Sequence, residues 1–218
     1  MTTVPWEYEI IVANNNSTDA TKDIAEHTGA HVVDEYTKGV VWARKAGFTA
    51  SSGELIASID ADNRLPHGWL KTVFERFTND ENLIALSGPL IYYDSPLYIR
   101  FWTKIFYIVG YAFNAASTIF GKGAMLQGGN YVMRRDAFLK SGGYDTTISF
   151  YGEDVDTGKR LAQVGKVTWT FALPMFSSGR RIEEEGLIIM GAKYGINYLW
   201  IVCTGRPFTE AYIDVRPR

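Results

Sequence analysis

The sequence predicts one α/β domain with helices on both faces of a mixed, mainly parallel sheet. Three apolar segments rich in β-branched residues, at 8–13, 30–34 and 54–62, are separated by helical segments at 17–28 and 38–53. Strands that alternate with helices in this way form parallel, right-handed βαβ units. The 218 residues suit one such domain, and no repeat, low-complexity tract or linker divides them.

Each of the first three strands leads into a helix. The first strand ends at the polar run NNNSTD, where either Ser17 or Thr18 is expected to cap a helix that Gly29 ends. A third helix is expected from Pro66 to Phe77, because proline favours the first helical position. Strand and helix therefore alternate over the first third of the chain.

The second half is expected to complete the same domain. A long strand is predicted over 83–93, and a strand with a short helix and a glycine turn over 124–145. A helix over 152–165 and a strand over 166–173 follow. A helical extension over 177–218 closes the single domain of residues 1–218.

The composition is that of an ordinary globular protein, with 46% hydrophobic and 21% charged residues. The net charge of −2 gives no reason to expect nucleic acid as a partner. The single cysteine, Cys203, excludes an internal disulfide and a cysteine-based zinc site, and it fits a reducing, cytoplasmic setting. His27, His31 and His67 do not form a spacing typical of metal ligands.

The most apolar stretch lies within 98–120, and two placements remain open for it. Its core, 105–120, has 16 residues, which is shorter than the ~20 that a spanning helix needs. Basic and aromatic residues flank it, a pattern suited to a membrane surface: Arg100, Trp102, Lys104, Tyr107 and Lys122. We expect either a helix at the inner face of the cell membrane or a helix packed on the domain's own sheet.

The segment SIDADN, residues 58–63, ends an apolar strand with two acids two positions apart. Side chains at that spacing in an extended segment point to the same side of the chain. Asp60 and Asp62 could then hold Mg²⁺ or Mn²⁺, which prefer oxygen ligands and bridge readily to a diphosphate. The alternative is an ordinary turn, in which Asp and Asn are common.

Other polar segments could border the same cleft. In sheets of this kind ligands bind beyond the carboxyl ends of the strands, and the run Asn14–Asp19 follows the first strand as the two acids follow the third. A solvated loop with a helix cap would equally explain that run. Arg180 and Arg181 suit phosphate oxygens, or they could pair with the glutamates at 183–185.

The segment GEDVD supplies a candidate base. Glu153 and Asp154 begin a predicted helix beside Phe150 and Tyr151. A carboxylate in such a place could accept a proton from an attacking hydroxyl. Acids in the first turn also stabilise any helix, so that simpler explanation remains open.

Four motifs, in this order and spacing, resemble the signatures of the family 2 nucleotide-sugar glycosyltransferases, which have the GT-A fold: EIIVANNNSTDAT, KGVVWARKAGFTASSGELIASIDADNRLPHGWL, LQGGNYVMRRDAFLKSGGYD and YGEDVDTGKRLAQVGKV. The resemblance covers residues 9 to about 171 and implies a three-layer α/β/α sandwich. It also implies a metal-dependent, inverting transfer of a sugar from a nucleotide diphosphate to a hydroxyl acceptor, either a glycan or a lipid-linked molecule.

The resemblance assigns roles to particular residues. Asp60 and Asp62 would form the DxD motif that binds Mg²⁺ or Mn²⁺ and the donor diphosphate, and Asp154 would be the base. The other donor-side residues would be Asn14, Asn15, Asn16, Arg44, Arg180 and Arg181. The acceptor side would have Gly128, Gly129 and Glu153, and Glu153 is also the competing candidate for the base.

Two departures from the family pattern bear on that function. The family usually has Asp at the position of Asn14, where it reads the nucleotide base, so the donor nucleotide remains open. Members also carry a strand and a helix before the position of Glu9. We therefore expect the sheet to lack a central strand and the nucleotide pocket to lack the part that these elements form. The alternative function is an inactive, sugar-nucleotide-binding relic of the same fold. The sequence names neither the sugar nor the acceptor, and it leaves open whether the chain forms a homo-oligomer.

Overall fold

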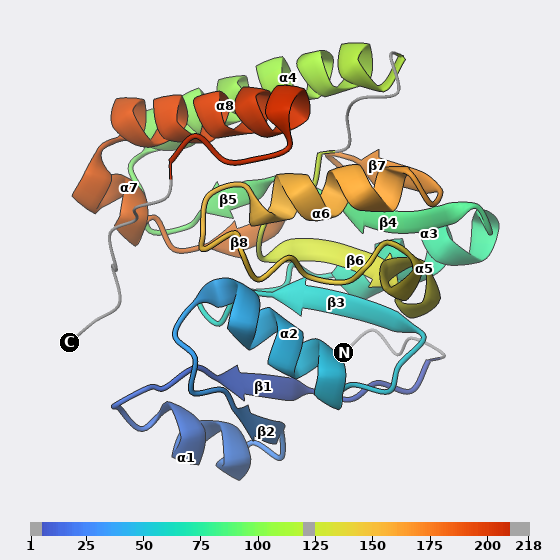
Figure 1. The fold of residues 1–218 in the computed structure, drawn as a ribbon. Helices are drawn as coiled ribbons and strands as arrows, with labels where there is room; N and C mark the ends of the chain where they lie inside the picture. The colour runs from blue at the N-terminus through green and yellow to red at the C-terminus, as the bar shows by residue number, and fades with distance from the viewer. Residues whose placement is uncertain (1–5, 120–124, 210–218) are drawn as a thin grey trace.

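The computed structural model describes residues 6–119 and 125–209 and has the mixed α/β architecture expected from the sequence (Figure 1). The elements are β1 (Ile11–Asn14), α1 (Thr21–His27), β2 (His31–Asp34), α2 (Val40–Ala50), β3 (Leu55–Ile59), α3 (Trp69–Asn79), β4 (Leu83–Ser87), β5 (Leu90–Tyr92), α4 (Leu97–Ile119), β6 (Asn130–Arg134), α5 (Arg135–Lys140), α6 (Glu153–Ala162), β7 (Lys166–Trp169), β8 (Met175–Ser177), α7 (Arg180–Glu185) and α8 (Leu187–Thr204).

The strands form one four-stranded sheet and two separate pairs. The central order is β3-β6-β4-β7, with β6 antiparallel to both of its neighbours and β4 parallel to β7. The pairs β1–β2 and β5–β8 are both parallel. Among the described strands, β1 pairs only with β2 and β3 only with β6. The β1–β2 pair lies below β3 in Figure 1.

Helices cover both faces of the central sheet because successive side chains of a strand point to opposite faces. Val132 of β6 joins the core under α3, which contains Trp69. Its neighbours Tyr131 and Met133 join the second core, which includes residues of α5 and α6. This alternation confirms the three layers expected for the domain.

Several element boundaries differ from those expected. The strand predicted over 83–93 is interrupted at Gly88, since a Cβ there would lie 2.0 Å from the carbonyl oxygen of Leu173, and the next residue is a proline. The third helix starts at Trp69 instead of Pro66, and Gly68 before it has a φ of 86°. The chain therefore turns at two glycines: Gly88 is required by a close contact with Leu173, and Gly68 by its positive φ.

The first helix also starts later than expected. Neither Ser17 nor Thr18 caps α1, which begins at Thr21. The Asp19 carboxylate instead accepts hydrogen bonds from the backbone N–H and the hydroxyl of Thr21, at 3.0 Å and 2.5 Å. A local Asx turn thus replaces the expected cap.

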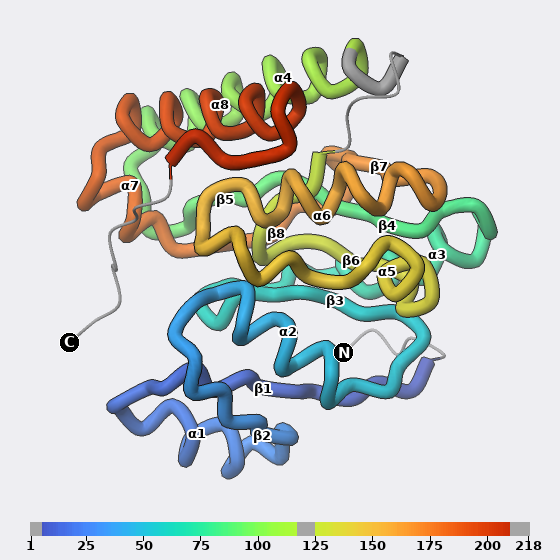
Figure 2. The backbone as a smooth tube through the Cα atoms, in the orientation of Figure 1, coloured from blue at the N-terminus to red at the C-terminus, as the bar shows by residue number. Residues whose placement is uncertain are grey.

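Helices α4 and α8 form an apolar layer above the sheet (Figure 2). Ile99, Thr103 and Tyr107, at a helical spacing of four, are the buried side of α4. Tyr198 of α8 reaches Asn114 of α4, with 3.4 Å between the side-chain oxygens. One face of α4 thus packs on the domain itself, which agrees with the placement on the domain's own sheet. Residue 120, the end of the predicted segment, lies outside the described residues.

The other face of this layer is exposed and apolar. Tyr98 and Trp102 on α4 are 63% and 55% exposed, and Ile188 on α8 is 85% exposed. By length and composition alone α8 could cross a membrane, and 17% of it is buried. Helix α8 lies within the helical extension expected over 177–218, but its apolar character was not predicted. Residues 210–218 of the expected C-terminal extension lie outside the described residues.

Candidate active site

Asp60 and Asp62 lie beyond the carboxyl end of β3, where the strand order predicts a ligand site. The strand ends at Ile59, and the two acids lie in a turn closed by a 3.0 Å hydrogen bond from the Asn63 N–H to the Asp60 carbonyl. The expectation that they occupy an extended segment is therefore wrong. A turn brings them to one cleft all the same, because both carboxylates line the same cavity.

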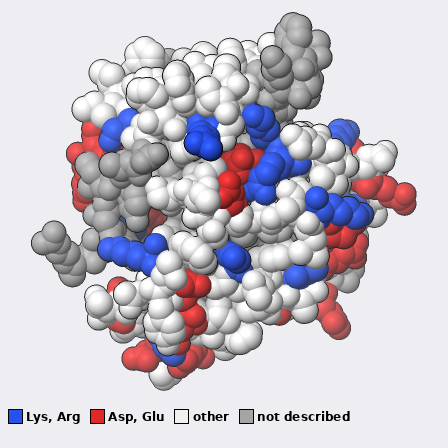
Figure 3. Space-filling view, viewed as in Figure 1, with Lys and Arg blue, Asp and Glu red and all other residues white. Residues whose placement is uncertain are grey.

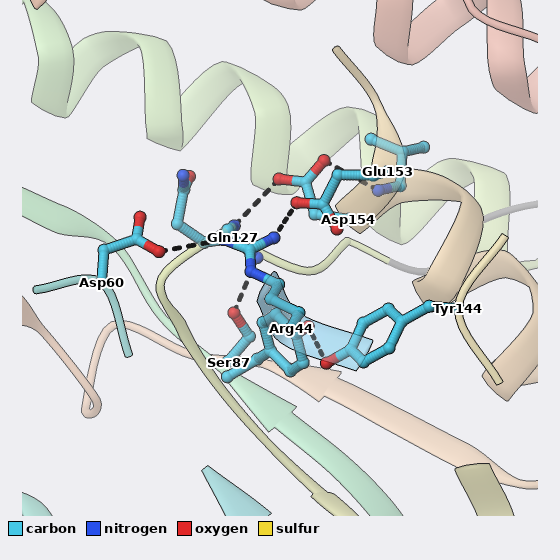
Figure 4. A network of polar contacts seen from close by, with 10 residues as sticks. Arg44, Asp60, Ser87, Gln127, Tyr144, Glu153 and Asp154 are labelled. Carbon is cyan, nitrogen blue, oxygen red and sulfur yellow. Dashed lines mark hydrogen bonds and ion pairs between the residues drawn. The ribbon is translucent and has the colours of Figure 1, made fainter. Parts of the chain in front are cut away.

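Arg44 of α2 connects the first acid to the helix that carries the candidate base (Figure 4). Its guanidinium contacts Asp60 Oδ1 at 3.0 Å and forms an ion pair with Glu153 Oε1. The side chains of Arg44 and Glu153 are 9% and 7% exposed. Burial opposes the charge on Arg44, but the two carboxylates outweigh it and raise the pKa of the guanidinium.

Glu153 and Asp154 begin α6 after Gly152, which has a φ of 83°. Burial raises the pKa of Glu153 to about 7 against the opposing charge of Arg44. Burial also raises the pKa of Asp154, while a 2.9 Å hydrogen bond from the Gly128 N–H to its Oδ2 acts in the opposite direction. The two adjacent acids therefore differ in partner: one faces a guanidinium and the other a backbone amide.

The loop over residues 127–129 lies close against these acids. A Cβ at Gly129, whose φ is 76°, would lie 2.3 Å from Asp60 Oδ2, and a Cβ at Gly128 would lie 3.3 Å from Asp154 Oδ2. Only glycine fits at Gly129 without displacing the carboxylate. The two glycines expected on the acceptor side therefore separate Asp60 from Asp154.

Buried polar groups that were not predicted from the sequence hold this loop in place. Asn130 accepts a hydrogen bond from the Trp69 indole at 3.1 Å and donates to the carbonyl of Gly88 at 3.0 Å. The backbone N–H of Gln127 donates to the Ser87 hydroxyl at 2.9 Å. No local pattern marks these residues, because their partners are distant in sequence.

Arg180 and Arg181 separate into different environments. Arg180 contacts Asp62 Oδ2 at 3.2 Å, and both side chains are partly exposed. Arg181 pairs with Glu185 at 2.9 Å and lies over the Phe150 ring, 4.5 Å from its centroid. Arg180 therefore faces the acids of the cleft. Arg181 pairs with a glutamate of the 183–185 run, which was the alternative expected for it.

Asn14 ends β1 and Asn15 and Asn16 follow it, but none of the three is among the residues that line the cavity of the two acids. The Asn14 amide donates to Asp34 at 2.7 Å, and the Asn15 amide donates to the carbonyl of Thr37 at 2.7 Å. Asn16 adopts a φ of 55°. In this structure the run connects the ends of β1 and β2.

Apart from Gly129, the remaining predicted residues line one cavity of about 1470 Å³. Its polar end is lined by Arg44, Asp60, Asp62, Gly128, Glu153, Asp154, Arg180 and Arg181. Apolar residues of α4 and α8 line the rest. Acids from the end of β3 and the start of α6 thus meet arginines of α2 and α7 within a mixed α/β sandwich, the fold class of the GT-A glycosyltransferases.

The sequence matches the model of Glycosyl transferase family 2 over residues 5–142, and the chain belongs to this family. The match ends before Glu153 and Asp154. Their assignment therefore depends on the geometry described above.

Solved structures show the same fold. Glucosyl-3-phosphoglycerate synthase from Mycobacterium tuberculosis, in complex with phosphoglyceric acid, has a TM-score of 0.62 at 22% identity, over 91% of this chain and 70% of that chain. Its complex with Mn²⁺ and uridine-diphosphate-glucose has a TM-score of 0.61 at 20% identity, over 90% and 68%. These likenesses confirm the GT-A fold.

Curated relatives are longer than this chain. Glucosyl-dolichyl phosphate glucuronosyltransferase from Haloferax volcanii is 27% identical over 128 residues, which are 56% of this chain and 39% of that protein. An uncharacterized glycosyltransferase from Mycobacterium tuberculosis is 34% identical over 82 residues, 38% of each. The chain thus spans about two fifths of the length of these relatives.

Proposed function

We propose that this domain catalyses a metal-dependent, inverting transfer of a sugar from a nucleotide-diphosphate donor to a hydroxyl acceptor, either lipid-linked or a glycan. The observation that supports it most is the single cavity lined by Asp60, Asp62, Arg44 and Asp154. Membership of the family and the acids beyond β3 support a nucleotide-sugar donor. An inactive, donor-binding relic is the alternative that the experiments below separate.

The two aspartates fit a hard divalent cation. Their side chains are 43% and 35% exposed, and each contacts an arginine through one carboxylate oxygen. The described part of the chain holds no group of three or more His, Cys, Asp or Glu suited to a metal, so diphosphate oxygens and water would complete the coordination. Asp60 and Asp62 would hold Mg²⁺ or Mn²⁺, which when bound offsets charge on the leaving diphosphate.

Arg44 and Arg180 would orient the donor diphosphate, because guanidinium groups suit phosphate oxygens. Asp154 would accept the proton of the acceptor hydroxyl as that oxygen bonds to the anomeric carbon. The bond from this carbon to the diphosphate breaks on the opposite side, which inverts the configuration. Glu153 is the weaker candidate for the base, because it is 6% exposed and already pairs with Arg44.

Two substitutions test these roles. Asp62→Asn should abolish Mn²⁺-dependent binding of the donor while the fold is kept, as measured by calorimetric titration with UDP- and GDP-sugars. Asp154→Asn should leave donor binding near normal and lower turnover by ~10²–10⁴-fold, the usual contribution of a general base. Glu153→Gln is the control. If that variant loses turnover and Asp154→Asn keeps it, Glu153 is the base and Asp154 is not. Donor binding without turnover in the parent protein would favour the relic.

We also propose that the domain works in the cytoplasm, in peripheral contact with the inner face of the cell membrane. The exposed aromatic and aliphatic side chains of α4 and α8 support this placement. The protein should float with vesicles that contain anionic lipid. Complete recovery in the soluble fraction would contradict the membrane contact and leave the proposed transfer untouched.

A further inference from the structure

The cavity of the active site continues, without a break, into an apolar groove between α4 and α8. At one end are the carboxylates of Asp60 and Asp154, and further along the walls are Trp102 and Phe106 of α4 and Ile189 and Leu199 of α8. Its volume of about 1470 Å³ exceeds the ~300–1,000 Å³ typical of small-molecule sites. Whatever fills it touches both the acids and the two helices.

Two glycines lie among the residues of α8 that line the groove. Gly191 and Gly195, four residues apart, both line the cavity, and a Cβ at either position would meet no heavy atom within 4 Å. Glycine costs about 1 kcal/mol relative to alanine inside a helix. These two residues therefore leave room beside α8 at a cost to the helix itself.

Nothing in the described part of the chain covers the groove's apolar walls. Trp102 is 55% exposed, and Ile189 and Leu199 are 57% and 45% exposed. The upper part of the molecule in Figure 3, where α8 lies, has few charged side chains, whereas both signs are scattered over the lower part. Such a continuous apolar patch marks a binding surface.

We propose that this groove binds a single hydrocarbon chain of the acceptor, whose hydroxyl-bearing head lies at the Asp154 end. This inference rests on the proposed transferase function and names its acceptor as an amphiphile. The support is the continuity of the cavity: one molecule must present a polar head to the acids and an apolar body to α4 and α8. A glycan acceptor would bury its hydroxyl groups against the indole and aliphatic walls without partners, which is costly.

The chain length of the acceptor should set its affinity. Each methylene that leaves water for an apolar site strengthens binding by about fourfold. The probes are methyl, hexyl and octyl β-D-glucosides, used below their micellar concentrations and titrated calorimetrically without donor. Affinity should rise about fourfold per methylene from hexyl to octyl glucoside, and methyl glucoside should bind weakest.

A matched pair of variants locates the chain. Gly195→Phe fills the groove at a position with open space and improves helix propensity, so it should fold and should abolish the dependence on chain length. Cys203→Phe adds the same side chain to an exposed position of α8 that does not line the cavity, and it should keep that dependence. Circular dichroism and thermal melting verify that both variants fold.

The outcomes separate this inference from the proposed function. Hexyl and octyl glucosides of equal affinity, or an unchanged slope in Gly195→Phe, would overturn the inference even if the domain transfers sugar. A slope that Gly195→Phe removes would support the groove even if no transfer occurs with any donor. Concentration-dependent dimers in sedimentation, with binding independent of chain length, would assign the groove to a second copy of this chain and also overturn the inference.

Discussion

Replacing Arg44 with methionine should destabilise the domain by about 3 kcal/mol near pH 8, because it removes the only positive charge that the structure places against Glu153 among the described residues. Loss of one partner of a buried ion pair typically costs about 3–5 kcal/mol. The two side chains are 9% and 7% exposed, so water replaces little of the lost interaction. Methionine keeps most of the volume of the aliphatic stem.

The size of the effect should depend on pH. The second contact of Arg44, with Asp60 at 3.0 Å, would have a Coulomb energy of ~5.5 kcal/mol at an effective dielectric constant of 20. The Asp60 side chain is 43% exposed, so the solvent screens most of that energy. The pKa of Glu153 is about 7, so this acid escapes part of the penalty by binding a proton. We therefore expect the lower end of the range at pH 8 and a smaller loss at pH 5, where Glu153 is protonated in both proteins.

Urea denaturation of parent and variant at pH 5 and pH 8 measures the difference in the free energy of unfolding. Lys140→Met is the matched control, since it breaks an ion pair with Asp136 whose side chains are 68% and 66% exposed. The control should change stability little at either pH. A loss below 1 kcal/mol for Arg44→Met at pH 8, or an equal loss at both pH values, would refute this account of the buried pair.

Two further substitutions test the geometry and the titration of the site. Gly129→Ala should lower donor binding and turnover, because its Cβ would lie 2.3 Å from Asp60 Oδ2. Gly143 has a similar positive φ but open space around it, so Gly143→Ala should lower stability without changing activity. Equal effects of the two would show that backbone strain alone matters. The pKa of Glu153 is raised from 4.5 to about 7 on folding, so the folded chain keeps a proton that the unfolded chain releases, and the unfolding free energy should fall as pH rises from about 4.5 to about 7. Glu153→Gln should remove that slope in pH-dependent denaturation, and a slope that persists in the variant would have to come from another group.

The alternation of strands and helices could be predicted because it depends on local patterns. The run over 30–34 became β2, and the helix predicted over 152–165 became α6. The first is a short β-branched run that follows Gly29, and the second carries apolar residues at a helical spacing and ends at Gly165. The parallel pairing of β1 with β2 follows the general rule that sequential strands pair, but β3, which was expected to join the same parallel sheet, pairs antiparallel with β6 instead.

The errors arose where distant residues decide the local structure. The strand over 83–93 is interrupted because Gly88 lies against the carbonyl of Leu173, and its own carbonyl accepts a hydrogen bond from Asn130. The apolar residues on both sides favour strands, whereas Gly88 and Pro89 between them are disfavoured in a strand interior and were given too little weight. The acids after β3 were expected to extend the strand, although a turn brings both to the same cavity.

Adjacent acids in a sequence give no basis for choosing between them, and the base is therefore decided by packing. Glu153 and Asp154 are neighbours on α6, yet the first pairs with Arg44 inside the protein and the second accepts a backbone N–H at the edge of the cavity. A base must reach the proton that it accepts, and an acid already held by a buried guanidinium is poorly placed to do so. Under the proposed mechanism Arg44 would serve the reaction in two ways. Its ion pair would hold the carboxylate of Glu153 in place at the wall of the cavity, and its contact with Asp60 would keep the guanidinium where the donor's diphosphate would lie.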